Sequence, residues 1–182
     1  GEAESWVSLM ETMTEGATAG TLAVIPALAL KDGQEIIVDN MTIRAHLNDW
    51  AHTKTDAMFV AVEEKVLFTG DNVTNGRIAR MNDGSFRGNR DVVAAAMSYP
   101  VDIVVPGHGE TGDKTVLEQF HTYINTVYSE AERLMDEGMD PFEMKAIIAG
   151  KVVAFKGWGG FDDELGKHIS LAALEAEQAA FE

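Results

Sequence analysis

The hydrophobic pattern of this sequence changes period once, and this change limits the possible folds more than any other feature. Between residues 34 and 70, apolar and β-branched residues recur with the two-residue period of strands. The turn residues Asp39-Asn40 and Glu63-Glu64 divide these runs, so we predict two hairpins, that is, four strands in antiparallel order. After residue 113 the period becomes helical. Strands followed by helices indicate a layered α/β fold.

One further strand and several helices complete the prediction. The apolar run at residues 101–105 reads as a buried strand, preceded by a helix from Arg90 to Ser98 that Asn89 caps. Asp113 is predicted to cap a long helix that Gly138 ends. Two more helices follow, the first opened by a capping box at Asp140-Pro141 with Glu143 and the second opened by Asp162.

The start of the chain has a different character. Four apolar residues recur at helical spacing before Gly16 and predict one face of a first helix: Trp6, Leu9, Met10 and Met13. Residues 20–30 then form an apolar connector that Pro26 interrupts. We divide the chain into a helix and connector at 1–30, a sheet with ligand-bearing loops at 31–112, and C-terminal helices at 113–182, all within a single partial domain.

Composition excludes several classes of function. The net charge is −16, from 30 acidic and 14 basic residues, and such a surface repels nucleic-acid backbones and anionic lipid. No run is long enough for a membrane span, so we expect a soluble protein and leave the compartment open between cytoplasm and periplasm. The chain has no cysteine, so any metal must be held by His, Asp or Glu.

Three potential metal ligands stand where strands give way to loops. Asp71 ends "LFTGD", His108 lies in "VVPGHGETGD", and His52 follows the second predicted strand. Loop residues at strand ends are positioned by rigid elements yet remain free to face a ligand. The other histidines, His46, His121 and His168, lie inside predicted strands or helices, and we interpret them as structural or exposed.

Two stretches together resemble a known superfamily. "AHTKTDAMFVAVEEKVLFTGDNVTNGR", followed by "VDIVVPGHGETGD", is similar to the C-terminal half of metallo-β-lactamase-fold hydrolases, over about residues 48–113. The resemblance implies half of a four-layer αββα sandwich, with a mostly antiparallel sheet and flanking helices. It also implies that His52 is a ligand of a first metal ion and His108 of a second, and that Asp71 bridges both ions and is the catalytic carboxylate. The expected metal is zinc, as two ions, with iron or manganese as alternatives.

The sequence departs from the family's pattern in two places. The "HxHxDH" motif that supplies the other ligands is missing, and Thr55 stands where the family usually has a small residue. Three explanations remain open: a C-terminal part of a longer enzyme, a natural half that pairs with another subunit, or a relative that has lost catalysis. An upstream "HxHxDH" in the gene would separate the first from the second.

The resemblance implies a metal-dependent hydrolase that uses metal-bound hydroxide on a small-molecule ester, thioester, amide or related bond. We expect the complete protein to be an enzyme and this chain alone, with half of the ligands, to be inactive. The alternative function is a non-catalytic half-domain that acts as an association module. We expect self-association, or pairing with the missing N-terminal half, because the strands carry more apolar residues than one helical layer covers.

Overall fold

The computed structural model describes residues 2–181, and the chain divides into two compact units at residue 30. The first unit contains α1 (Glu2–Met13) and an irregular connector. The predicted first helix is therefore confirmed. Its predicted apolar face is exposed, with Trp6 63% and Met13 69% accessible, and Leu22 and Leu28 in the connector are exposed as well. None of the helices within residues 2–181 is both long and apolar enough to cross a lipid bilayer.

The second unit is built on one five-stranded sheet. Its strands are β1 (Glu35–Val38), β2 (Met41–Asn48), β3 (Asp56–Ala61), β4 (Val66–Thr74) and β5 (Ile103–His108), and they lie in this order across the sheet. The first three pairings are antiparallel, so both predicted hairpins are confirmed. The last pairing, β4 with β5, is parallel, because a helical crossover connects these strands.

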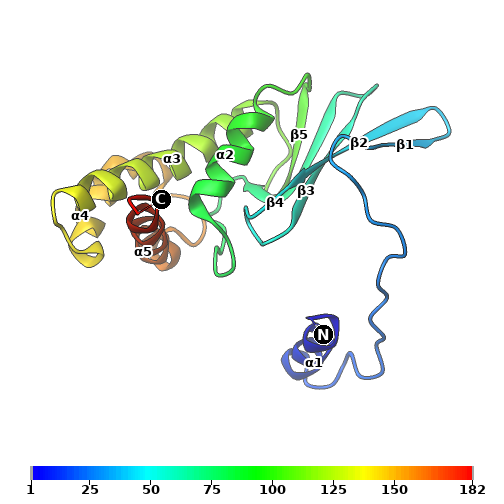
Figure 1. Ribbon diagram of the computed structural model, residues 1–182, viewed down its shortest axis with the longest axis horizontal. Coiled ribbons are helices and arrows are strands. Elements are labelled where there is room, and N and C mark those ends of the chain that lie inside the picture. Colours follow the sequence, from blue (N-terminus) through cyan, green and yellow to red (C-terminus); the bar gives the residue numbers. More distant parts are fainter. Residues whose placement is uncertain (1, 182) are drawn as a thin grey trace. The chain divides into compact units, whose positions relative to one another are not determined.

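The helices gather beside β4 and β5, and the β1–β2 hairpin extends away from them (Figure 1). They are α2 (Phe86–Ala96), α3 (Thr115–Asp136), α4 (Pro141–Lys151) and α5 (Phe161–Ala179), with a short 3₁₀ turn at Val153–Phe155. The mixed α/β fold with flanking helices is thus confirmed. The capping box of α4 is present as predicted, and Asp113 accepts a hydrogen bond of 2.9 Å from the Thr115 backbone N–H at the start of α3.

Two predicted helix starts are wrong. The helix expected from Arg90 begins at Phe86, because Ser85 caps it by accepting a 2.9 Å hydrogen bond from the Gly88 N–H. Asn89, the predicted cap, is instead buried inside that helix. The last helix begins at Phe161 after Gly160, whose φ of 80° ends the preceding loop, so Asp162 lies within the first turn.

The core lies between the helices and one face of the sheet. Leu67 of β4 and Val104 of β5 are neighbours in register, and both are fully buried where α2 and α3 pack on these strands. The alternating positions point the other way, and there Phe68 is 43% and Ile103 42% exposed. The sheet therefore has one covered face and one open face, and its edge strand β1 is exposed along its whole length.

Candidate metal centre

The three predicted ligands come from the loop between β2 and β3, from β4 and from β5. His52 lies in the loop, Asp71 lies within the second half of β4, and His108 is the last residue of β5. Because β4 and β5 are parallel, their carboxyl ends meet at one edge of the sheet. The pairing is irregular between Phe68 and Thr74, so Asp71 leaves the regular ladder although it is still within the strand.

The side chains of these residues converge, with Asp71 in the middle. Its Oδ2 lies 3.8 Å from Nε2 of His52, and its Oδ1 lies 3.4 Å from Nε2 of His108. Each carboxylate oxygen therefore faces a different imidazole. The Asp71 carboxylate therefore lies between the two imidazoles, and the two histidines do not contact the same carboxylate oxygen.

Two glycines make this arrangement possible. Gly70 adopts a φ of 53°, a left-handed conformation that favours glycine, immediately before Asp71. Gly107 lies against this segment so closely that a Cβ there would stand 2.6 Å from the Gly70 carbonyl oxygen and would overlap Oδ1 of Asp71. Gly107, the first glycine of "PGHG", is thus required because β5 comes so close to the Asp71 carboxylate.

Two asparagines hold the histidine backbones. The buried Asn72 accepts a 3.3 Å hydrogen bond from the His52 N–H, which ties the β2–β3 loop to β4. The Asn75 N–H donates to the His108 carbonyl at 2.8 Å. The sequence offered no reason to select either residue, although Asn72 directly follows "LFTGD".

Nδ1 of His52 is buried and has no hydrogen-bond partner among residues 2–181, so it is an unsatisfied polar atom beside the site.

A cavity of about 270 Å³ opens in front of the three predicted ligands. Its walls also include residues of the loop that follows β4, so the complete lining is His52, Asp71, Thr74, Arg77, Ala79, Arg80 and His108. The two arginines come from a stretch rich in glycine and asparagine, and nothing in the sequence indicated that they face this cavity.

The donor types suit a transition metal, since neutral imidazole and carboxylate are common ligands of zinc, iron and manganese. Within the described part of the chain, however, no three or more His, Cys, Asp or Glu side chains are grouped so that they could hold one ion. The distances explain this, because the contacts are pairwise through Asp71. The described residues therefore present pairwise contacts through Asp71 and no closed group of three ligands.

The remaining histidines lie elsewhere. His46 of β2 stacks on Tyr99 with ring centroids 4.1 Å apart, and partial burial lowers its pKa. His121 lies on α3, where burial also lowers its pKa. His168 of α5 is buried between Tyr123 and the Ala79 carbonyl. None of the three lines the cavity with Asp71.

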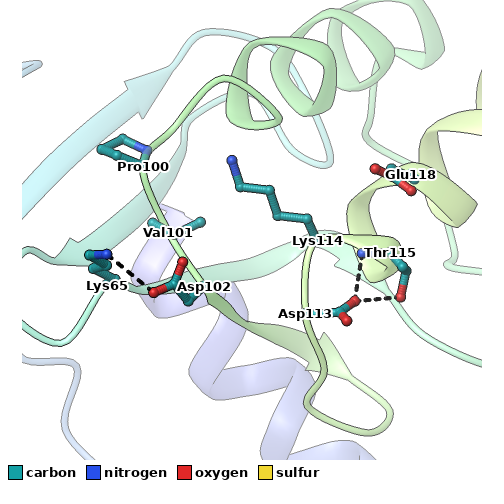
Figure 2. Close-up of a pocket in the computed structure, with 8 residues that line it drawn as sticks. All are labelled: Lys65, Pro100, Val101, Asp102, Asp113, Lys114, Thr115 and Glu118. Carbon is teal, nitrogen blue, oxygen red and sulfur yellow. Dashed lines mark hydrogen bonds and ion pairs between the residues drawn. The ribbon is translucent and has the colours of Figure 1, made fainter.

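A larger hollow of about 490 Å³ lies where β4 and β5 begin, away from the predicted ligands (Figure 2). Several of its charged groups have partners: Lys65 pairs with Asp102 at 3.3 Å, and Asp113 binds Thr115. The Lys114 ammonium donates to the Tyr99 carbonyl at 2.6 Å near the end of α2. These contacts link the segments next to β5, α2 and α3, so we assign the side chains around the hollow a structural role.

Comparison with known proteins relates this fold to metal-dependent hydrolases. The sequence profile of the metallo-beta-lactamase superfamily matches residues 7–108, more than half of the chain. No curated protein matches the chain in sequence. Among solved structures, the stereoselective inverting sec-alkylsulfatase Pisa1 from Pseudomonas sp. has a TM-score of 0.65 at 17% identity, covering 85% of this chain and 27% of that one.

A metallo-beta-lactamase from Pontibacter korlensis is 20% identical, with a TM-score of 0.49, and covers 63% of this chain. The chain spans 53% of the length of that protein and 27% of the sulfatase. At these identities the likeness to the sulfatase concerns the fold alone.

Proposed function

This chain belongs to the metallo-beta-lactamase superfamily, and we propose that it contributes His52, Asp71 and His108 to the metal site of a hydrolase. Membership of the superfamily indicates a metal-dependent hydrolase in general. The single observation that carries the assignment of residues is the position of Asp71, whose two carboxylate oxygens face two different histidines at 3.8 and 3.4 Å.

In this proposal Asp71 is shared by two metal positions, and each histidine serves one of them through Nε2. The bridging role is supported by the close packing of Gly107, which keeps the carboxylate between the imidazoles. The His52 N–H donates to the Asn72 side-chain oxygen and the Asn75 N–H donates to the His108 carbonyl, so the backbone is fixed at both candidate ligands.

Zinc ions at these positions would supply Lewis-acid activation of water for attack on an ester, thioester, amide or related bond. The side chains named here hold and orient, and none of them is required as a nucleophile. Zinc in catalytic sites usually has about three protein ligands. This chain supplies two per position, so we expect weak zinc binding and no turnover by the chain alone.

Isothermal titration of the chelator-treated protein with zinc tests the proposal. We expect saturable binding by the wild type and a loss of affinity of at least about tenfold in Asp71→Asn, because both positions lose their shared ligand. His108→Ala should remove one of the two positions.

His121→Ala is the matched control, since it deletes a histidine that lies on α3 outside the cavity. Equal zinc affinity in Asp71→Asn, His108→Ala and the wild type would overturn the assignment. An equal loss in His121→Ala would show instead that binding is nonspecific.

A second candidate function, association through the sheet, is favoured by the exposed strands. On the edge strand β1, Ile37 is 71% and Val38 57% exposed, and on the open face Phe68 is 43% exposed. Unpaired edges and open apolar faces promote pairing with another chain. We propose that this surface mediates self-association or pairing with a further part of the enzyme, and this role is compatible with the hydrolase proposal.

A further inference from the structure

His52 differs from the other two predicted ligands because no strand carries it. Asp71 and His108 belong to β4 and β5, whereas His52 lies in the loop of residues 49–55 between β2 and β3. Its side chain is nevertheless only 17% exposed, compared with 51% for His108. The position of this imidazole therefore depends on whatever holds the 49–55 loop.

The loop lies against the residues that begin α2. The backbone N–H of Ser85 donates a 2.8 Å hydrogen bond to the carbonyl of Ala51, which is completely buried. The indole N–H of Trp50 donates to the Asp83 carbonyl at 2.7 Å. Two hydrogen bonds thus join the residues just before His52 to the residues just before α2.

Two glycines allow the loop to come this close. A Cβ at Gly84 would stand 2.8 Å from the His52 carbonyl oxygen and 2.9 Å from that of Ala51. A Cβ at Gly88 would overlap the carbonyl oxygen of Trp50. Gly88 lies within α2, where alanine is the better helix former, so this glycine is explained by the contact with the loop and not by helix propensity.

The start of α2 is itself held by the last helix. The Glu175 carboxylate on α5 accepts hydrogen bonds from the backbone N–H groups of Phe86 at 2.7 Å and Arg87 at 2.8 Å. The Ser85 hydroxyl also donates to Glu175, at 3.2 Å. The 49–55 loop therefore lies on a helix terminus that is bonded to another helix.

We propose that Trp50 and Gly88 are positioning residues, which place the His52 imidazole beside Asp71 by holding the 49–55 loop on the start of α2. The inference rests on the function proposed above and adds these two residues to its site. Both lie outside the cavity in front of Asp71, so they act through the backbone of His52. A binding site needs such support, because a loop that shifts slightly displaces its ligand atom from the productive position.

The proposal predicts a selective effect, because His108 is held differently. His108 ends β5, and its carbonyl accepts the 2.8 Å hydrogen bond from the Asn75 N–H. Changes at Trp50 or Gly88 should therefore disturb His52 and leave His108 in place. A purely structural role would lower the free energy of unfolding without this difference between the two histidines.

Long-range ¹H–¹⁵N NMR spectra of the imidazoles, which report on the chain's five histidines, test the inference in the metal-free protein. Trp50→Phe removes the indole N–H and keeps an aromatic ring, and Gly88→Ala pushes the loop away from α2. We expect both variants to shift and broaden the His52 signals and to leave the His108 signals unchanged. In a zinc titration, the affinity reported by His52 should fall by about tenfold, as when groups that support a ligand are removed, and that reported by His108 much less.

Gly150→Ala is the matched control, since it changes a helical glycine on α4 where a Cβ meets nothing within 4 Å. Its His52 signals should match those of the wild type. Unchanged His52 signals in Trp50→Phe and Gly88→Ala, or equal changes at His52 and His108, would overturn the inference. If Gly88→Ala does not fold, Trp50→Phe decides alone. A wild type that binds no zinc would refute the metal site only, because the metal-free His52 signals still decide the role of Trp50 and Gly88.

Discussion

The hydroxyl of Tyr123 on α3 donates a 3.0 Å hydrogen bond to Nδ1 of His168 on α5. The other ring nitrogen of His168, Nε2, lies 2.9 Å from the Ala79 carbonyl, which only accepts. Burial lowers the pKa of His168 to about 4, so at neutral pH the ring is neutral, with its proton on Nε2 toward Ala79 and Nδ1 accepting from Tyr123. A buried chain of two hydrogen bonds links two helices to the segment that carries Arg77 and Arg80.

This relationship predicts a loss of stability in mild acid. Burial lowers the pKa of His168 from 6.5 to about 4, so the unfolded state binds a proton that the folded state does not bind between these values. The stabilising contribution is complete above pH 6.5 and decreases as the pH falls toward 4. We expect about 3 kcal/mol of unfolding free energy to be lost over this range on account of His168. Urea unfolding at several pH values measures it. In His168→Gln this component should vanish, and an unchanged pH dependence would contradict the assignment.

Glu175 is predicted to stabilise the start of α2. Its carboxylate, on α5, accepts hydrogen bonds from the backbone N–H groups of Phe86 at 2.7 Å and Arg87 at 2.8 Å. These are first-turn donors that have no partner within the helix. Glu175→Ala should therefore lower the free energy of unfolding by about 1–2 kcal/mol. Glu177→Ala, an exposed change on the same helix, is the control and should be nearly neutral by urea denaturation.

Gly107→Ala is predicted to damage the metal centre and to lower stability, because both the Asp71 carboxylate and the Gly70 backbone must shift. The added methyl group would overlap Oδ1 of Asp71 and approach Gly70, so the carboxylate must move. We expect zinc affinity to fall by about tenfold or more. Gly157→Ala is the matched control, because a Cβ there meets nothing within 4 Å. Titration with zinc compares the two variants, and equal affinities would show that Asp71 tolerates displacement.

Ile37→Lys is predicted to reduce self-association. Ile37 is 71% exposed on the edge strand β1, where a lysine opposes pairing with another strand. Light scattering after size-exclusion chromatography should show a smaller average mass than for the wild type. Val153→Lys, at a residue that is 62% exposed beyond α4, should leave the mass unchanged. A wild-type protein that is already monomeric at high concentration would remove the basis of the association proposal.

The sequence predicted those parts of the fold that depend on local patterns. Both hairpins, the capping box at Asp140 and the strand before His108 follow from residue spacing and turn chemistry. The start of α2 was missed because the local cap at Ser85 was overlooked, and because its second support is tertiary: Glu175, far along the chain, binds the donors at Phe86 and Arg87. No local pattern at Asn89 could reveal this contact.

The candidate site was likewise predictable where local motifs mark it and not where nonlocal contacts form it. His52, Asp71 and His108 were identified by motifs, and the structure places them together. Arg77 and Arg80 lie in a stretch of glycine and asparagine that reads only as a loop. Their placement depends on bonds to Gly159 and His168, which belong to segments far along the chain. A single sequence carries no signal for such pairings.

The parallel pairing of β4 with β5 also bears on how the centre assembles during folding. Asp71 and His108 reach one edge of the sheet only after the chain has passed through the whole of α2. Such a nonlocal pairing has a loop-closure cost that hairpins avoid, so we expect the two hairpins to form earlier than this strand pair. The three candidate ligands would then come together only in the last, cooperative step of folding. Metal capture in a refolding experiment would thus report completion of the native topology and not an early intermediate.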